Sequence, residues 1–396
     1  MGNRIPPALV AQADTFVALR RDLHRHPELG FEELRTSALV AEKLSEWGYA
    51  VTRGLGGTGV VGQLRRGTGQ RRLGLRADMD ALPITEATGL LHASCHAGLM
   101  HACGHDGHTA MLLAAAHHLA KHGQFSGTLN LIFQPAEEGL GGARKMMEDG
   151  LFERFPCDAI FAMHNMPGHP PGHLLFRSGA FMASSENITI TLHGVGGHGA
   201  LPHHSADPVV AGAAIVMGLQ SIVARNVPPL QMAVITVGAF QAGEANNVIP
   251  QTATLKLSVR SLNRDVRELL NRRIRELVEA QAHSYGVRAD IDFRGGYPVL
   301  VNTPAETEFA RQIGRELVGS DHITEQAEPL TGSEDFAFML EDIPGSYLLI
   351  GNGDAATGGH GACMVHNPNY DFEDRNIAVG SAYWVRLAER FLDGTS

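Results

Sequence analysis

The sequence has 396 residues, which is long enough for two domains of ordinary size. Hydrophobic residues make up 44% of the sequence and charged residues 19%, the usual balance of a soluble globular protein. The net charge of −10 argues against a general nucleic-acid binder, because such proteins present a basic face.

The sequence shows no sign of export or of a membrane span. Its N-terminal stretch, MGNRIPPALVAQADTF, has no long apolar segment, and no run of eighteen apolar residues occurs in the chain. The four cysteines are too few for a disulfide scaffold, and we expect Cys95, Cys157 and Cys363 to be ordinary thiols. We therefore expect a cytoplasmic protein that partners neither nucleic acid nor membrane.

The first part of the chain alternates helices with short strands. Glycines punctuate two N-terminal helices, predicted over 8–26 and 31–47. The elements that follow are strands over 71–77, 127–133 and 158–163, and helices over 108–122 and 144–150. This alternation predicts the α/β fold class, with a mostly parallel sheet that helices cover on both faces.

The element order changes from about residue 185. Strands are predicted over 187–194, 232–240, 252–260 and 289–293, and helices over 206–224 and 264–286. The resulting order, βαββαβ, is ferredoxin-like. A helix over 304–317, a strand over 346–351 and a helix over 374–392 come afterwards. We expect a first domain over 1–184 that resumes over 297–396, with a ferredoxin-like lid or dimerisation domain over 185–296 between its two parts.

One glycine-rich stretch imitates a dinucleotide-binding fingerprint. GLGGTG, residues 54–59, matches G-x-G-x-x-G, but VVGQL follows it and reads as a strand instead of the required helix. We interpret the stretch as a hairpin turn. The sequence contains no phosphate-binding G-x-x-x-x-G-K-[ST], no G-x-S-x-G nucleophile elbow and no H-E-x-x-H.

Residues of the types that bind metals gather at the ends of the predicted strands. They are Asp78 and Asp80 in RADMDALP, Cys103 and His105 in MHACGHDGHTA, Glu137 and Glu138 in QPAEEG, His164 in HNMP and His366 in VHNPNY. Because ligands bind beyond the carboxyl ends of strands in an open α/β sheet, these side chains are expected at one edge. A mixture of thiol, imidazole and carboxylate suits Zn²⁺, Mn²⁺, Co²⁺ or Ni²⁺.

The adjacent acids Glu137 and Glu138 indicate two different roles. Neighbouring side chains of an extended segment point apart, so one carboxylate can bind a metal while the other faces the open coordination position. There it can take a proton from a water molecule that the ion has activated. This arrangement can hydrolyse an amide bond.

The sequence resembles the M20 metallopeptidase family, and most closely its amidohydrolase branch of hippurate hydrolases, N-acyl-amino-acid deacylases and plant auxin-conjugate hydrolases. The motifs that carry the resemblance occur in order along nearly the whole chain: LHRHPELGFEE, RADMDALP, MHACGHDGHTAMLL, IFQPAEEGLGGARKM, MHNMPG, GGHGALPH, NNVIP, GSEDFAFM and HNPNYDFED. The resemblance implies a di-metal catalytic domain interrupted by a ferredoxin-like lid.

The resemblance also implies roles for individual residues. Two divalent ions would be bound by Cys103 as a bridging thiolate together with His105, Glu138, His164 and His366, and Glu137 would be the general base. Asp78 and Asp80 occupy the position where other branches have His-x-Asp, and we interpret them as groups that orient the ligands.

The lid carries further residues to which the resemblance assigns roles. His198 in GGHGA would reach a neighbouring subunit's active site and stabilise the oxyanion. Asn247 in NVIP and Arg260 in SVR would contact the substrate, with Arg260 suited to a carboxylate. Gly332 and Ser333 would offer backbone N–H groups to the substrate. A homodimer or homotetramer is therefore expected.

We predict a metal-dependent amidohydrolase that cleaves N-acyl-amino acids, of the hippurate type, into a carboxylic acid and a free amino acid. The alternatives within enzymes are a dipeptidase or carboxypeptidase, and a deacetylase of the N-acetyl-diaminopimelate type. A non-catalytic protein that binds amino-acid conjugates on the same scaffold is the alternative from another class.

Overall fold

The computed structural model describes residues 5–393, which fold into two compact units. The larger unit comprises the chain up to Gly179, then Val301–Glu328, and then the chain from Phe338 onward. The smaller unit comprises Ala180–Leu300 and the short segment Pro329–Ala337, which carries Gly332 and Ser333.

The larger unit is built on an eight-stranded sheet with the order β1-β2-β4-β3-β5-β16-β6-β15. The four central strands, β4, β3, β5 and β16, are parallel, whereas the pairs β1–β2, β2–β4 and β16–β6 are antiparallel. The mostly parallel sheet that we predicted is thus confirmed at its centre, and the antiparallel pairs lie towards its edges. The strands are β1 (Ala50–Leu55), β2 (Gly59–Arg66), β3 (Arg72–Asp78), β4 (Gly127–Gln134), β5 (Ala159–Pro167), β6 (Leu174–Leu175), β15 (Ile323–Thr324) and β16 (Gly345–Gly353).

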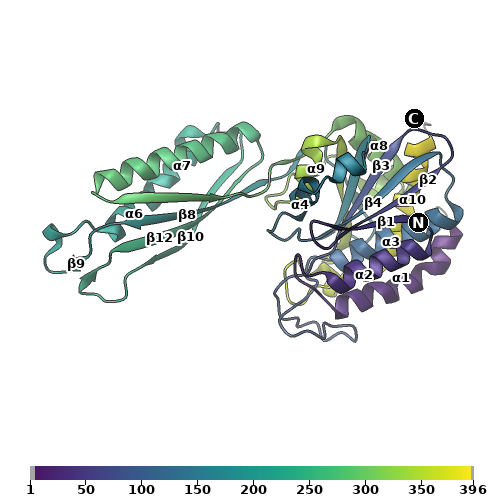
Figure 1. Ribbon diagram of the computed structural model, residues 1–396, viewed down its shortest axis with the longest axis horizontal. Coiled ribbons are helices and arrows are strands. Elements are labelled where there is room, and N and C mark those ends of the chain that lie inside the picture. The colour runs from purple at the N-terminus through teal and green to yellow at the C-terminus, as the bar shows by residue number, and fades with distance from the viewer. Residues whose placement is uncertain (1–4, 394–396) are drawn as a thin grey trace. The chain divides into compact units, whose positions relative to one another are not determined.

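Helices cover both faces of this sheet (Figure 1). At their centre, α3 packs against α1, α10 and β3, and the side chains of Ala114, Ala115 and Ala116 are buried because their small size permits close packing. The helices are α1 (Pro7–Arg25), α2 (Leu34–Glu46), α3 (His105–His122), α4 (Gly142–Glu148), α5 (Leu151–Arg154), α8 (Pro304–Val318), α9 (Phe336–Asp342) and α10 (Asn376–Asp393), with short 3₁₀ turns at Ser320–His322 and His360–Ala362.

The smaller unit has the predicted ferredoxin-like order of elements. Its four antiparallel strands lie in the order β10-β12-β8-β13, and α6 and α7 pack against this sheet (Figure 1). The elements are β8 (Ser184–His193), α6 (Pro208–Asn226), β10 (Ala233–Ala242), β12 (Thr252–Ser261), α7 (Arg264–Ser284) and β13 (Arg288–Arg294). Shorter elements are β7 (Gly179–Met182), β9 (Gly197–His198), the 3₁₀ turn Pro202–His204, β11 (Val248–Ile249) and β14 (Leu300–Asn302).

The helix α6 is long and apolar enough to cross a membrane when length and composition alone are considered. Within the smaller unit it buries Ala211, Ile215, Leu219 and Ile222 in a core shared with β8, β10 and β12. Packing on the sheet therefore explains these buried residues, whereas Val209, Val210 and Met217 of the same helix are exposed. Asp207 caps its first turn by accepting a hydrogen bond from the N–H of Val209 at 2.8 Å.

The stretch GLGGTG forms the turn of a hairpin, as predicted. β1 pairs antiparallel with β2, with Leu55 opposite Gly59. Gly56 and Gly57 have φ values of 62° and 87°, and two successive positive φ values are typical of the turns that join tight hairpins. All four cysteines are free thiols: Cys157 is buried, Cys363 is partly buried and Cys95 is exposed.

Candidate metal centre

The candidate ligands are positioned by the central parallel strands. β3 ends at Asp78, β4 ends three residues before Glu137, and β5 carries His164. Because these strands are parallel neighbours, their carboxyl ends meet at one edge of the sheet. We expected His164 to follow its strand, but β5 extends to Pro167 and contains it.

Cys103 lies where two groups of donor atoms meet. In one group its Sγ lies within 4.8 Å of donor atoms of His105 and His164, and in the other within 4.8 Å of donor atoms of Glu138 and His366. The distance from Cys103 Sγ to His164 Nε2 is 3.3 Å. The structure thus brings the five candidate ligands together within the larger unit, and the shared sulfur fits a thiolate between two divalent cations.

His105 has a buried imidazole nitrogen, Nε2, that makes no hydrogen bond. We expected His105 in the loop before a helix that starts at residue 108, but α3 begins at His105 because Gly104 adopts a left-handed conformation with φ of 88°. Asp80 Oδ1 lies 3.2 Å from His105 Nδ1, whereas His105 Nε2 is buried and makes no hydrogen bond. A buried imidazole nitrogen that makes no hydrogen bond, with its other nitrogen held by a carboxylate, is the arrangement of a metal ligand.

The carboxylates Asp78 and Asp80 lie beside the two ring nitrogens of His105, Asp80 at Nδ1 and Asp78 at Nε2. Asp80 holds two candidate ligands at once, because its Oδ2 accepts a hydrogen bond from the backbone N–H of Glu138 at 2.9 Å. Asp78 Oδ1 lies 2.6 Å from His108 Nδ1, and its Oδ2 lies 3.8 Å from His105 Nε2. Although burial lowers the pKa of His105, the two carboxylates outweigh it and raise that pKa to about 10.

The Glu137-Glu138 pair occupies a turn and not an extended segment. Ala136 has a positive φ of 54°, and its N–H donates to Glu33 Oε1 at 2.8 Å. One oxygen of Glu137, one of Glu138 and a ring nitrogen of His105 consequently lie within 4.8 Å of one another. Our expectation that the two adjacent side chains point apart is therefore wrong, because the left-handed residue before them turns the chain.

His164 and His366 are held by backbone groups. His164 Nδ1 lies 2.6 Å from the carbonyl oxygen of Asn165, which leaves Nε2 for the cluster. His366 has a positive φ of 67°, and its N–H donates to the carbonyl oxygen of Ala102 at 2.7 Å. Its Nε2 lies 3.3 Å from Glu138 Oε1, and this contact raises the pKa of His366.

The electrostatics of the cluster favour a cation. Burial raises the pKa of the Cys103 thiol well above its usual value, and Glu138 and Glu137 raise it further. Burial lowers the pKa of His164, and His108 lowers it further, so this imidazole is neutral. A divalent cation would stabilise the Cys103 thiolate, so binding of the cation would release a proton.

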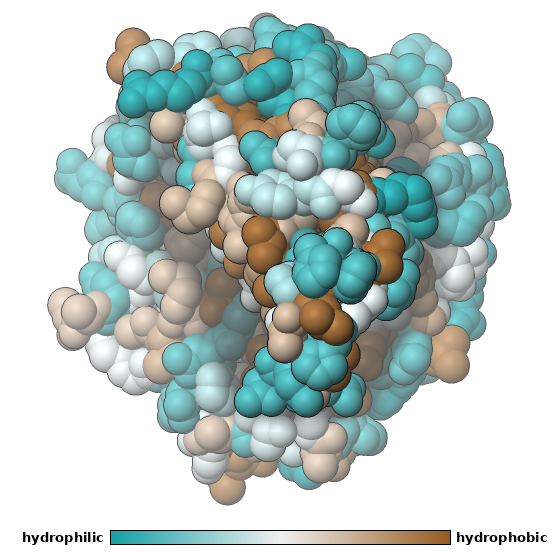
Figure 2. Space-filling view, turned by 90° about the vertical axis from the view of Figure 1, so that its left-hand side faces the viewer, coloured by the Kyte–Doolittle hydropathy of each residue, from teal (hydrophilic) through white to brown (hydrophobic). Residues whose placement is uncertain are grey.

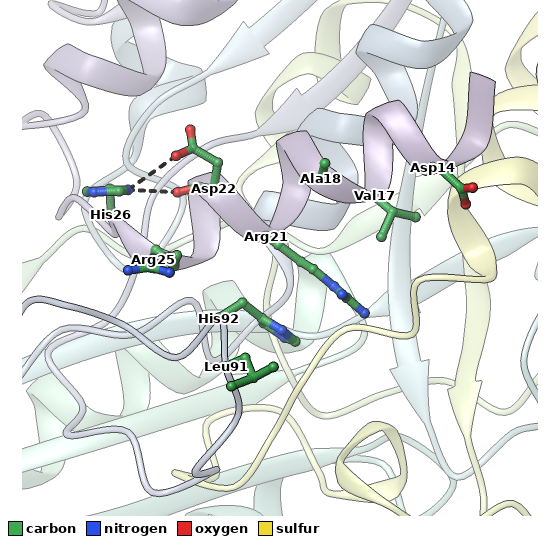
Figure 3. A pocket seen from close by; sticks show the side chains of 9 residues that line it. All are labelled: Asp14, Val17, Ala18, Arg21, Asp22, Arg25, His26, Leu91 and His92. Atoms are coloured by element: carbon green, nitrogen blue, oxygen red, sulfur yellow. Dashed lines mark hydrogen bonds and ion pairs between the residues drawn. The ribbon is translucent and has the colours of Figure 1, made fainter.

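Two carboxylates connect a surface cavity to a buried arginine. The cavity, of about 690 Å³, lies beside α1, and Figure 3 shows Arg21 and His92 on the same side of this helix. His92 Nε2 lies 3.1 Å from Asp371 Oδ2, and Arg21 Nη2 lies 2.7 Å from Asp374 Oδ2. The other oxygens of these carboxylates bind the fully buried Arg20 at 2.8 and 2.9 Å. This network ties α1 to the segment that follows His366.

A buried histidine extends the network to the start of α3. His24 Nδ1 lies 2.9 Å from Asp106 Oδ2, and its Nε2 lies 3.4 Å from Glu86 Oε1. Burial opposes the charged imidazolium, but Asp106 and Glu86 outweigh burial and raise the pKa of His24 to about 9. Asp106 follows His105 directly, so these charges support the helix that carries a candidate ligand.

The smaller unit holds the lid residues in two separate pairs. β9 pairs with β11, with His198 opposite Val248, and the N–H of Gly199 donates to the carbonyl oxygen of Asn247 at 2.8 Å. Arg260 Nη1 donates to Ser333 Oγ at 3.0 Å, and burial lowers the pKa of the Arg260 guanidinium. His198 therefore lies beside Asn247, and Arg260 lies beside Ser333.

The two pairs lie at opposite ends of the four-stranded sheet. β12 begins at Thr252, next to the β9–β11 pair. Just before it, the carbonyl oxygen of Gln251 accepts a hydrogen bond from the N–H of Gly194, and Ile249 of β11 pairs with Gly197 of β9. Arg260 lies eight residues further along this strand, a distance of about 26 Å at the usual rise of a β-strand. Gly332 is adjacent to Ser333, and its carbonyl oxygen accepts a hydrogen bond from Ala183 N–H at 2.8 Å.

Sequence reasoning missed three buried polar residues at the metal centre. His108, Asn165 and Tyr370 all lie within the motifs quoted above, and each is at most 1% exposed. Their hydrogen bonds join the Cys103 loop, β5 and the segment after His366. The signal available in the sequence was a polar residue next to or near a candidate ligand, which is too common to be informative alone.

Known proteins resemble this chain over its whole length. Peptidase family M20/M25/M40 matches residues 74–390. Hippurate hydrolase of Campylobacter jejuni is 43% identical over 390 residues, which cover 98% of this chain and 100% of that protein. N-acetyldiaminopimelate deacetylase of Geobacillus thermodenitrificans is 40% identical over 377 residues, which cover 93% of this chain and 97% of that protein.

A solved structure has the same fold as this chain. The crystal structure of the Bacillus subtilis YXEP protein, a dinuclear metal-binding peptidase from the M20 family, superimposes with a TM-score of 0.82 at 33% identity. The match covers 97% of this chain and 99% of that one. With the match to residues 74–390, these similarities show that the chain belongs to peptidase family M20/M25/M40.

Proposed function

We propose that the protein is a metal-dependent amidohydrolase that cleaves N-acyl-amino acids of the hippurate type into a carboxylic acid and a free amino acid. The observation that carries this proposal is the convergence of four other ligand side chains on Cys103, with the carboxylate of Glu137 near two members of the cluster, His105 and Glu138. The similarity to a hippurate hydrolase at 43% identity supports the same substrate class.

Cys103, His105, Glu138, His164 and His366 would hold two divalent cations, from among Zn²⁺, Mn²⁺, Co²⁺ and Ni²⁺. When bound, the cations would polarise the amide carbonyl and make a water molecule more acidic. Asp80 contacts both His105 and Glu138 and so holds the two together, and Asp78 holds His108, whose ring lies beside those of His105 and His164.

Glu137 acts as the general base. Its carboxylate lies within 4.8 Å of donor atoms of His105 and Glu138, so it reaches the site without being one of the five proposed ligands. It accepts a proton from the attacking water and passes it to the amide nitrogen as the C–N bond breaks. The products are a carboxylic acid and an amino acid with a free amine.

The lid residues favour a site completed by a second subunit. His198 and Asn247 lie near the end of β12 that begins at Thr252, whereas Arg260 lies about 26 Å further along that strand, so we infer that one small substrate does not touch all three within one unit. In a homodimer or homotetramer, Arg260, with Ser333 and the backbone at Gly332, binds the substrate carboxylate in one site. His198 and Asn247 then serve the site of a neighbouring subunit, where His198 stabilises the oxyanion.

Exposed apolar side chains support this assembly. Figure 2, which faces the left-hand side of Figure 1, shows hydrophobic residues in brown among hydrophilic residues in teal. In the smaller unit the large hydrophobic residues with about half or more of their surface exposed are Val195, Val210, Met217, Leu230 and Val248. A contact with a second copy would remove such surface from water. We also propose a cytoplasmic location, because the free thiol of Cys103 must stay reduced to bind a cation.

The test is a substrate panel on metal-stripped protein reconstituted with each of the four cations. Benzoyl-glycine, N-acetyl-diaminopimelate, other acetyl-amino acids and dipeptides are compared by their kcat/KM values. We expect turnover only after a cation is restored, with benzoyl-glycine preferred. Preference for N-acetyl-diaminopimelate would favour the deacetylase suggested by the relative at 40% identity. Cation binding without turnover of any amide would overturn the proposal in favour of a binding protein.

A further inference from the structure

Three segments that carry candidate ligands meet at the buried side chain of Asn165. Its Nδ2 donates to the carbonyl oxygen of Cys103 at 2.6 Å. Its Oδ1 accepts a hydrogen bond from the hydroxyl of Tyr370 at 2.6 Å. Its own carbonyl oxygen lies 2.6 Å from His164 Nδ1. Asn165 and Tyr370 are both 0% exposed, so no bulk water competes for these hydrogen bonds.

The same asparagine fixes the protonation of two histidines. A carbonyl oxygen can only accept, so His164 must carry its proton on Nδ1 and present an unprotonated Nε2 to Cys103. The backbone N–H of Asn165 donates to His108 Nε2 at 2.9 Å, so His108 carries its proton on Nδ1 and donates it to Asp78. Nε2 of His164 is thereby kept in the form that binds a cation.

Tyr370 fixes which way the Asn165 amide faces. The amide oxygen points to the tyrosine hydroxyl, so the amide nitrogen points to Cys103. Space around the contact is small: a Cβ on Gly104 would lie 2.3 Å from Asn165 Nδ2 and 2.4 Å from Tyr370 Oη. If the hydroxyl were removed, the amide oxygen would be left without its donor in a tightly packed site.

We propose that Tyr370 is a positioning residue for the metal centre, acting through Asn165 on the Cys103 loop and the His164 ring. Tyr370 lies four residues after His366, so the contact also joins that ligand's segment to the other two. This inference rests on the proposed metal-dependent function. The hydroxyl of Tyr370 would then affect cation affinity as well as folding, although its hydrogen bond goes to Asn165 and not to any of the five ligand side chains.

A matched pair of variants tests the inference. Tyr370→Phe removes the hydroxyl at the metal centre. Tyr383→Phe removes an equally buried hydroxyl that donates to the carbonyl oxygen of Ala310 at 2.9 Å in the helical core. For each protein we would measure the dissociation constants of Zn²⁺ and Co²⁺ by competition with a chelator. The absorption of the thiolate–cobalt bond and the melting temperature without metal would be recorded alongside.

We expect Tyr370→Phe to weaken cation binding by about tenfold to hundredfold and to change the thiolate–cobalt absorption. Tyr383→Phe should leave both unchanged while lowering the melting temperature of the metal-free protein to a similar extent. Equal cation affinities in the two variants would overturn the inference alone. Failure of the wild-type protein to bind any divalent cation would overturn the proposed function, and this inference with it.

A double-mutant cycle tests the route through the asparagine. In an Asn165→Ala background, Tyr370→Phe should weaken cation binding no further, because its effect passes through the missing amide. An undiminished effect of Tyr370→Phe in that background would overturn the inference. If Asn165→Ala does not fold, Asn165→Ser takes its place with the same two outcomes.

Discussion

The two units hold their candidate functional residues in opposite ways. In the larger unit Cys103 and His105 are buried, and Nδ1 of His105 lies within hydrogen-bond distance of the carboxylate of Asp80. In the smaller unit His198 and Asn247 are exposed, and His198 Nδ1 has only a local contact with the N–H of Ala200 at 3.1 Å.

This difference follows from what each kind of residue does. A cation needs several donors at fixed distances, so its ligands must be held before the cation arrives; hydrogen bonds hold them, together with burial at Cys103 and His105 but not at the exposed His366. A residue that meets substrate across a subunit boundary must remain accessible until the partner is in place. Changes to the ligands and their supports in the larger unit should therefore affect cation binding and stability, whereas changes to the exposed or half-buried residues of the smaller unit should affect turnover or substrate binding without loss of the cations.

The largest expected effect is that of Glu137→Gln, the one change at the buried centre that should spare the cations. Loss of the general base should lower kcat by about a thousandfold. The number of bound cations should stay that of the wild-type protein, because Glu137 is not among the five proposed ligands. Activity is measured on benzoyl-glycine and metal content by elemental analysis.

Glu268→Gln, the same change at an exposed position of α7, serves as the control and should alter neither quantity. Near-normal activity in Glu137→Gln would show that another group takes the proton. Loss of a cation would instead place Glu137 among the ligands.

The second largest effect is expected in the pH dependence of stability, through the charged His24 of the larger unit. The pKa of His24 is about 9 in the folded protein and near 6.5 when unfolded, so the imidazolium stabilises the fold fully below pH 6.5. This contribution, about 3 kcal/mol, is lost as the pH rises through 9. The difference in unfolding free energy between wild type and His24→Gln should therefore shrink between pH 6.5 and pH 9.

Another buried histidine provides the control for this titration. Burial lowers the pKa of His118, so its imidazole is neutral throughout the same pH range. The destabilisation caused by His118→Gln should consequently stay constant where that of His24→Gln declines. Parallel pH profiles for the two variants, obtained by denaturant unfolding, would contradict the assignment of a charged His24.

The contrast between the units also explains what the sequence could predict. The alternation of strands and helices and the βαββαβ order depend on local patterns, and both are found in the structure. Donor residues near the carboxyl ends of successive parallel strands must meet, so Glu138 and His164 could be placed at one edge from the sequence, and Cys103 could be added from its place in the loop before a helix.

Other features depend on contacts that no local pattern encodes. The left-handed Ala136 turns Glu137 and Glu138 towards each other, and left-handed Gly104 starts α3 at His105. The link from Asn165 to Tyr370 spans 205 positions of sequence. Neither an asparagine nor a tyrosine is diagnostic of a metal site, so only the fold reveals that these two residues form a pair. The proposed roles of His198 and Asn247 rest on the resemblance to the M20 family, because the sequence around an exposed residue does not by itself indicate a function.

The third largest effect is expected at an exposed residue of the smaller unit, His198. His198→Ala should lower kcat by about a hundredfold through loss of an oxyanion donor. The melting temperature and cation content should not change, because the side chain is exposed.

Mixing two inactive variants shows in which subunit His198 acts. When Glu137→Gln and His198→Ala proteins are dissociated and reassembled together, a mixed dimer contains one site with both wild-type residues only if His198 acts across subunits. About one quarter of the wild-type activity should then return. If no activity returns from confirmed mixed dimers, His198 serves the site of its own subunit.

The smallest expected effect belongs to Arg260, which combines features of both units because it is half-buried yet lies in the smaller one. Its guanidinium donates to Ser333 Oγ at 3.0 Å, which leaves other donors for a substrate carboxylate. Arg260→Met should raise KM for benzoyl-glycine about tenfold with little change in kcat, since the ground state and the transition state share this contact. Benzoyl-glycinamide, which has no carboxylate, should lose nothing in the variant, and Arg264→Met should leave both substrates unaffected because Arg264 is 81% exposed. An equal loss for the two substrates would mean that Arg260 shapes the lid and does not recognise the charge.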